Sequence, residues 1–99
     1  MVKAISILGS SGSIGRQTAA VAHHLHIPVK AISVRKDIAR AEEQARLFRP
    51  DLVAVYDEDA AAMLRERIAD LKIPVLSGEE GLIAAATVPM ADCVVTAVS

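Results

Sequence analysis

Three glycines stand three residues apart near the start of the sequence, at Gly9, Gly12 and Gly15, with serines between them. They follow an apolar run and precede a stretch of helical periodicity, which indicates a strand, a tight turn and the start of a helix. Gly9 allows a sharp turn, Gly12 lets the backbone approach a ligand, and Gly15 lets helix and strand pack closely. The free N–H groups at the helix start would then face an anion. The loop therefore predicts diphosphate binding.

The end of the second apolar run bears on which dinucleotide the loop would hold. NAD-binding domains place an acidic residue there, about 20 positions after the loop, to bind the ribose hydroxyls. Here that place reads Ser33-Val34-Arg35-Lys36, with two cations and no acid. Arg35 and Lys36 would pair with a 2′-phosphate, which an acid would repel. We expect NADP(H) rather than NAD(H), and Asp37 is better placed as a helix cap.

Plainer interpretations of these residues stay open. A Gly/Ser turn can join a strand to a helix without any ligand, and Arg35 and Lys36 can be solvated loop residues. His23, His24 and His26 do not predict a metal site, because adjacent histidines on a helix point about 100° apart. No pairing of a nucleophile with a base, and no pair of acids, indicates a catalytic residue in this chain.

Strands and helices are expected to alternate around the loop. Apolar runs predict strands at residues 4–8, 29–34, 52–55, 73–76 and 93–98, with helices between them that end near residues 24, 48, 70 and 86. Strands that read as continuous apolar runs are typical of a parallel sheet covered by helices. The sequence therefore predicts an α/β fold, a doubly wound, Rossmann-like sheet of about five strands with helices on both faces.

Several local signals refine this expectation. Asp37 and Asp57 are candidate helix caps, and residues 77–80 have the spacing of a capping box. Cys93 lies in an apolar run and is expected to be a small buried residue. One face of the first helix is expected to carry its apolar side chains, namely Ile14, Thr18, Val21, Ala22 and Leu25.

Composition excludes several classes of protein. A hydrophobic content of 53% excludes a disordered tail, and a net charge of −1 supplies no global positive field for nucleic acid or an anionic membrane. The single cysteine fits a reducing cytosol, and no signal peptide or membrane-spanning stretch is visible. We expect one cytoplasmic domain over residues 1–99. Because the chain stops where a strand finishes, we expect it to be part of a longer enzyme.

Three segments make the chain resemble the N-terminal domain of the 1-deoxy-D-xylulose 5-phosphate reductoisomerase family. Residues 7–15 read ILGSSGSIG, close to the family's ILGSTGSIG, and residues 75–82 read VLSGEEGL, similar to its VLSGxEGL. Residues 31–37 read AISVRKD, where the family often has a small residue, Gly, Lys and Asn. The resemblance covers all 99 residues but only the first part of the family's full length.

The resemblance implies the activity of a full-length enzyme. Such an enzyme, implied to be a homodimer, rearranges the phosphosugar 1-deoxy-D-xylulose 5-phosphate and reduces the resulting aldehyde with NADPH and a divalent metal, Mg²⁺ or Mn²⁺. The product is 2-C-methyl-D-erythritol 4-phosphate, in the non-mevalonate route to isoprenoids. The family's nucleotide contacts correspond here to Ser11, Gly12, Ser13 and Ile14 in the loop and to Arg35, Lys36 and Asp37 beside the 2′-phosphate.

Two of these positions depart from the family pattern: Arg35 replaces a frequent Gly, and Asp37 replaces a frequent Asn and adds negative charge beside the phosphate. The family's metal-binding acids and catalytic lysine lie downstream, so this chain alone is expected to be inactive. Two alternatives remain: another NADPH reductase, of the aspartate-semialdehyde dehydrogenase or dihydrodipicolinate reductase type, and a nucleotide-sensing module without chemistry of its own.

Overall fold

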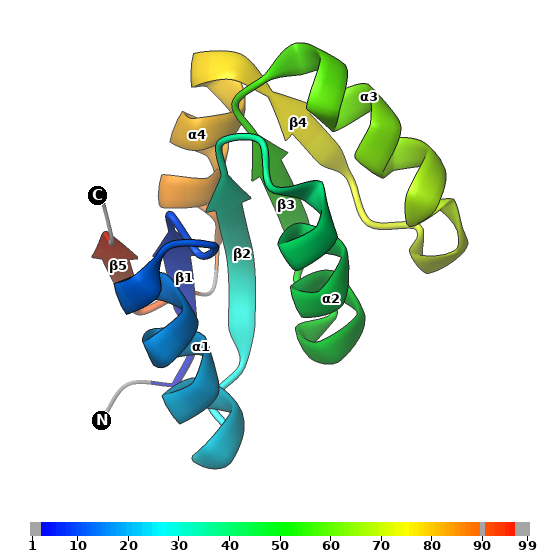
Figure 1. Ribbon diagram of the computed structural model, residues 1–99. Coiled ribbons are helices and arrows are strands. Elements are labelled where there is room, and N and C mark those ends of the chain that lie inside the picture. Colours follow the sequence, from blue (N-terminus) through cyan, green and yellow to red (C-terminus); the bar gives the residue numbers. More distant parts are fainter. Residues whose placement is uncertain (1–2, 90, 97–99) are drawn as a thin grey trace.

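The computed structural model describes residues 3–89 and 91–96, in which strands and helices alternate along the chain (Figure 1). The order is β1 (Ile5–Leu8), α1 (Ser13–His24), β2 (Val29–Val34), α2 (Ile38–Phe48), β3 (Leu52–Val55), α3 (Glu58–Arg67), a short 3-10 helix (Ala69–Leu71), β4 (Val75–Ser77), α4 (Gly78–Ala86) and β5 (Cys93–Thr96).

All five strands join one parallel sheet in the order β4-β3-β2-β1-β5. The chain builds outward from β1 to β4, and α4 then carries it back across the sheet to the far side of β1. The strand order thus reverses between β1 and β5. In open α/β sheets, ligands bind beyond the carboxyl ends of the strands at such a reversal.

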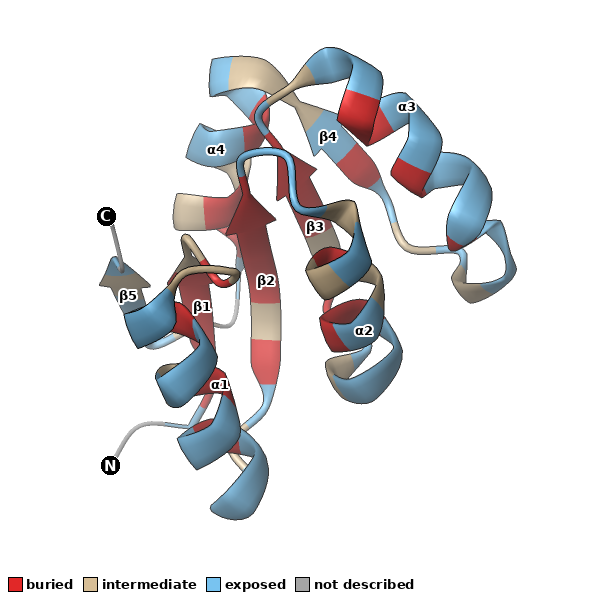
Figure 2. Cartoon of the chain, in the orientation of Figure 1, coloured by how far each residue is buried: buried red, intermediate tan, exposed pale blue. Residues whose placement is uncertain are grey.

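Helices cover both faces of the sheet, as the sequence predicts. On one face α1, α2 and α3 pack against the larger core cluster (Figure 2), which includes Ile7, Ile32 and Val53. On the other face α4 packs against a smaller cluster that includes Ala31 and Ala54. The alanines on the smaller face let α4 lie close to the strands. No helix among the described residues is long and apolar enough to cross a membrane.

The first helix buries a different face from the one that its larger apolar residues predict. Gly15, Ala19 and Ala22 face the sheet, whereas Ile14 is 62% exposed and Val21 is also exposed. The reason lies in the glycine loop, residues 9–15: a Cβ added at Gly15 would stand 2.1 Å from the carbonyl oxygen of Gly9. Because the helix begins so close to the loop, only small side chains fit beneath it.

Three details of the third and fourth βα units also correct the sequence-based expectation. The strand covers Val75–Ser77 instead of 73–76, because Pro74 has no N–H to donate to the sheet. The capping box at 77–80 is not formed: Ser77 precedes α4, yet it pairs with Val55 as the last residue of β4, and its side chain makes no cap hydrogen bond. The third helix ends at Arg67, with a 3-10 turn instead of α-helix up to residue 70.

The expectation that Cys93 is buried is wrong. Its side chain is exposed, as is Val94 beside it. Both lie on β5, which pairs only with β1 in the described part of the sheet and is poorly covered by its helices. The run of apolar residues 93–96 therefore marks a strand correctly but not a buried one, and residues 97 and 98 of the predicted strand lie outside the described residues.

Candidate functional site

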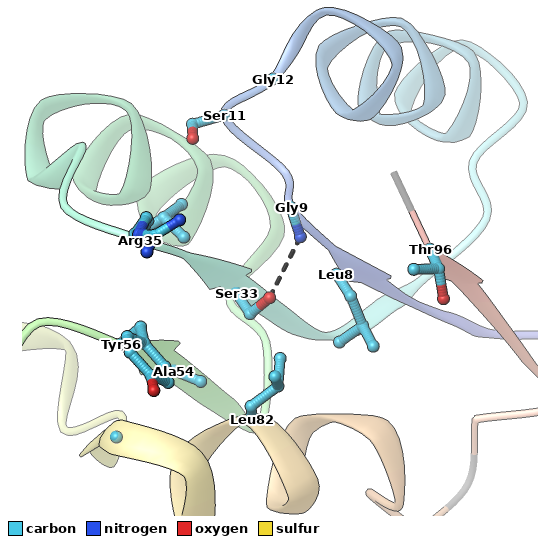
Figure 3. A pocket seen from close by; sticks show the side chains of 12 residues that line it. Leu8, Gly9, Ser11, Gly12, Ser33, Arg35, Ala54, Tyr56, Leu82 and Thr96 are labelled. Atoms are coloured by element: carbon cyan, nitrogen blue, oxygen red, sulfur yellow. Dashed lines mark hydrogen bonds between the residues drawn. The ribbon is translucent and has the colours of Figure 1, made fainter. Parts of the chain in front are cut away.

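A cleft of about 420 Å³ opens at the carboxyl edge of the sheet, where the strand order reverses (Figure 3). Its walls come from the ends of β1, β2, β3 and β5 and from the start of α4. The glycine loop forms one side, and the end of β3 with α4 forms the opposite side. The lining residues are Leu8, Gly9, Ser11, Gly12, Ser33, Val34, Arg35, Ala54, Tyr56, Gly78, Leu82 and Thr96.

Ser33 ties the glycine loop to the end of β2. Its carbonyl oxygen accepts hydrogen bonds from the backbone N–H groups of Gly9, at 2.9 Å, and Ser10, at 2.8 Å. Its hydroxyl oxygen accepts a further bond from the Gly9 N–H at 3.0 Å (Figure 3). Gly9 has a positive φ of 81°, so the sharp turn expected there is confirmed. The loop is thus held at its base by the neighbouring strand.

Gln44 supports the same loop from a different helix. Its side-chain Nε2 donates a buried 2.9 Å hydrogen bond to the carbonyl oxygen of Ser10, while its Oε1 has no partner among the described residues. Sequence reasoning missed both Ser33 and Gln44. The available signal was polarity in a buried pattern, because Gln44 lies on the helix face of Ala41 and Ala45 and Ser33 interrupts an apolar strand.

The N-terminus of α1 is open toward the cleft. Its N-cap is Gly12, which has no side chain to cap the helix, and its first turn carries no acidic residue. Among the described residues, no acceptor pairs with the N–H groups of Ser13 and Ile14. By contrast, the side chains of Asp37 and Asp57 cap α2 and α3. Free N–H groups and the positive end of the helix dipole together suit an anion.

The structure brings only some of the predicted site residues together. Ser11, Gly12 and Arg35 line the cleft, with Arg35 between the loop and Tyr56. The other two predicted loop contacts, Ser13 and Ile14, are the first residues of α1, and both are exposed.

Lys36 and Asp37 follow Arg35 but do not line the cleft, and both are exposed. Asp37 caps α2 by accepting a 3.0 Å hydrogen bond from the N–H of Arg40, which confirms the predicted cap. The side chain that reaches the cleft from this segment is therefore Arg35.

The described residues contain no group of three His, Cys, Asp or Glu side chains that could hold a metal ion. Near the end of α1, the ring of His23 packs edge-on against Phe48. The cleft offers open backbone N–H donors and one guanidinium to anionic groups. It also offers apolar walls to a flat apolar group.

Comparison with known proteins identifies the family to which this chain is similar. The chain matches the sequence profile of 1-deoxy-D-xylulose 5-phosphate reductoisomerase over residues 5–99. It is 47% identical over 98 residues to the 1-deoxy-D-xylulose 5-phosphate reductoisomerase of Lachnoclostridium phytofermentans. The match covers 98% of this chain and 25% of that protein.

Solved structures give the same result. A DOX-P reductoisomerase in complex with magnesium superimposes with a TM-score of 0.89 at 28% identity, over 99% of this chain and 25% of that one. Another, in complex with NADPH, fosmidomycin and magnesium, gives 0.87 at 29% identity, over 97% of this chain and 24% of that one. The chain thus spans about a quarter of the length of these relatives. It belongs to the 1-deoxy-D-xylulose 5-phosphate reductoisomerase family.

Proposed function

We propose that residues 1–99 form the NADPH-binding domain of an enzyme that converts 1-deoxy-D-xylulose 5-phosphate to 2-C-methyl-D-erythritol 4-phosphate. The observation that carries this proposal is the uncapped N-terminus of α1, which opens on a cleft that also holds Arg35. Family membership favours this enzyme over the semialdehyde dehydrogenase and dihydrodipicolinate reductase alternatives.

The glycine loop would bind the diphosphate. Its backbone can approach the phosphates because Gly12 has no side chain, and the free N–H groups of Ser13 and Ile14 would donate to phosphate oxygens. The hydroxyl of Ser11, which lines the cleft, adds a donor. Ser33 and Gln44 hold the loop in place before the nucleotide arrives, which reduces the entropy lost on binding.

Arg35 would bind the 2′-phosphate at the end of β2. A guanidinium can donate two parallel hydrogen bonds to a phosphate, and no acid lines this part of the cleft among the described residues. Lys36 adds positive charge nearby, whereas Asp37, which caps α2, adds a negative charge. The balance of charge still favours NADPH over NADH.

Catalysis requires groups beyond those that the described residues supply. NADPH, when bound, supplies the hydride that reduces the rearranged substrate. A divalent metal, Mg²⁺ or Mn²⁺, needs ligands, and the described residues contain no group of three His, Cys, Asp or Glu side chains that could hold it. We therefore assign those ligands to the remainder of a longer, cytoplasmic, homodimeric enzyme, in which this domain holds and orients the cofactor.

A pair of measurements tests this proposal. NADPH should bind to the 99-residue chain in calorimetric titration but should not be consumed when 1-deoxy-D-xylulose 5-phosphate and Mg²⁺ are added. The full-length protein should consume NADPH under the same conditions. Binding without turnover by the full-length protein would favour the nucleotide-sensing module, and turnover by the 99-residue chain would place the active site within it. Failure to bind either nucleotide would contradict the assignment of the cleft.

A further inference from the structure

Tyr56 is a half-exposed aromatic ring on the wall of the cleft. It is the only tyrosine in the sequence, its side chain is 51% exposed, and it extends from the end of β3 on the side opposite the glycine loop (Figure 3). The single phenylalanine, Phe48, packs instead against the main core. The cleft therefore contains an aromatic ring of which about half is left exposed by the fold's own packing.

The backbone around Tyr56 is held on both sides. Its N–H donates to the carbonyl of Val34 at 3.0 Å, and its own carbonyl accepts from the N–H of Gly78 at 3.1 Å. The next residue, Asp57, donates its N–H to the carbonyl of Arg35 at 3.0 Å and caps α3 with its side chain. Arg35 and Tyr56, which directly follow β2 and β3, are thus neighbours at the ends of adjacent strands. The backbone that carries the ring is anchored without a ligand.

The space in front of this wall is open. A Cβ added at Gly78, which follows β4 in the cleft lining, would meet no atom within 4 Å. Ala54 and Leu82 supply further apolar surface beside the ring. A flat apolar group can therefore enter next to Tyr56 without displacing a side chain.

We propose that Tyr56 is the stacking surface for the adenine of the nucleotide. This inference rests on the proposed function. Adenine and the 2′-phosphate are attached to neighbouring carbons of one ribose, so the residue beside the phosphate-binding Arg35 is the one placed to meet the base. Adjacent strands lie about 4.8 Å apart, so the residues that follow β2 and β3 are close enough to meet two groups on one ribose. Stacking on an aromatic ring accepts any base through its flat face.

Tyr56 and Arg35 then have separable roles. Adenine is common to NADPH and NADH, so Tyr56→Ala should weaken the binding of both about tenfold and leave their ratio unchanged. Arg35→Ala should reduce the ratio itself. Tyr56→Phe retains the ring and should bind as the unmodified chain does, whereas Tyr56→Leu retains bulk without a π-face and should lose most of the effect. Met63→Ala removes a large exposed side chain on α3, outside the cleft lining, and should leave both affinities unchanged.

Proton NMR of the 99-residue chain tests stacking directly, with adenosine 2′,5′-bisphosphate as the probe. Because the sequence has one tyrosine and one phenylalanine, both rings can be followed separately. Tyr56 ring signals should move upfield and show contacts with the adenine protons, while Phe48 signals stay in place. If the amide signals of the glycine loop shift but Tyr56 does not respond, this inference is wrong and the proposed function stands. If neither responds, the proposed function fails and this inference fails with it.

Discussion

The side chain of Gln44 and the backbone of Ser10 are joined by a buried 2.9 Å hydrogen bond that links α2 to the glycine loop. We expect Gln44→Met to retain the shape of the side chain but leave the Ser10 carbonyl without its donor. Unfolding free energy should fall by about 1–3 kcal/mol. NADPH binding should weaken on the order of threefold to tenfold, because the loop is no longer held in place.

Urea unfolding and calorimetric titration measure the two effects of this change. Gln17→Met is the matched control, since Gln17 is exposed on α1 and makes no side-chain hydrogen bond among the described residues. A loss of stability with unchanged NADPH affinity would show that Gln44 supports the core but not the loop.

Gly12 and Gly15 should respond differently to substitution. Gly12 has φ −74° and ψ 172°, which any residue adopts, so Gly12→Val should fold and lose at most about 1 kcal/mol at the N-cap. Its side chain would occupy the space that the diphosphate needs, so NADPH binding should be abolished. Circular dichroism and titration test both halves, and wild-type affinity in the folded variant would show that the loop is only a turn.

Gly15→Ala should instead damage the fold. The added Cβ would lie 2.1 Å from Gly9 O and 2.7 Å from Ser10 Cα, so the loop backbone must move. We expect a loss of roughly 1–3 kcal/mol of unfolding free energy, measured by urea unfolding. Unchanged stability would mean that α1 can lift from β1 without cost.

The sequence predicts those parts of the fold and the site that local rules determine. The turn at Gly9 depends on backbone freedom, and the Asp37 cap depends on a side chain reaching an N–H three residues on. Both follow from residue type and spacing, and both are confirmed. The parallel sheet follows equally from apolar runs that alternate with helical periods.

Contacts between distant segments could not be predicted in the same way. The bond from Gln44 to Ser10 joins residues 34 positions apart, and the ring of Tyr56 meets the cleft only because β3 lies beside β2. The sequence does not predict which face of α1 is buried. Periodicity assigns the more hydrophobic residues to the buried face, whereas the close approach of helix and loop at Gly15 admits only small residues there.

Arg35 and Lys36 should make the chain prefer NADPH to NADH. Charge-assisted hydrogen bonds to phosphate are worth about 1.5–3 kcal/mol, which corresponds to roughly tenfold or more in affinity. Replacing both residues by alanine should bring the two affinities close together, mainly by weakening NADPH. Calorimetry with both nucleotides measures this, and Lys30→Ala, on β2 but outside the cleft lining, is the control. Equal affinities in the unmodified chain would contradict the prediction.

The ion pair between Arg46 and Asp70 should add a small, pH-dependent stability. The guanidinium of Arg46, 2.9 Å away, hydrogen-bonds Asp70 and lowers the pKa of that carboxyl. A lowered pKa in the folded state stabilises the fold above the ordinary pKa, and this stability is lost as pH falls through the lowered value. Asp70→Asn should therefore lower the urea midpoint slightly at pH 7.

The effect of Asp70→Asn should shrink toward zero at the lowest pH at which the chain stays folded. Urea unfolding at the two pH values measures it, with the exposed Asp51→Asn as a control for loss of a surface charge. A difference between Asp70→Asn and the unmodified chain that does not change with pH would exclude the ion pair as its cause.

Asp37→Asn should raise the affinity for NADPH while leaving the fold intact. The carbonyl oxygen of asparagine can accept the hydrogen bond from the Arg40 N–H that Asp37 accepts now, so stability should change by only a few tenths of a kcal/mol. Removal of a negative charge two residues from Arg35 should strengthen binding of the 2′-phosphate by about threefold to tenfold. NADH, which lacks that phosphate, should bind as before.

Asp37→Ala separates the two roles of this side chain. It removes the same charge but also the cap, so it should show the same gain in NADPH affinity together with a loss of about 1 kcal/mol in unfolding free energy. Titration of both variants with both nucleotides gives the affinities, and urea unfolding of both variants gives the stabilities. If neither variant changes NADPH affinity, Asp37 lies too far from the 2′-phosphate to affect it, and its role is confined to the start of α2.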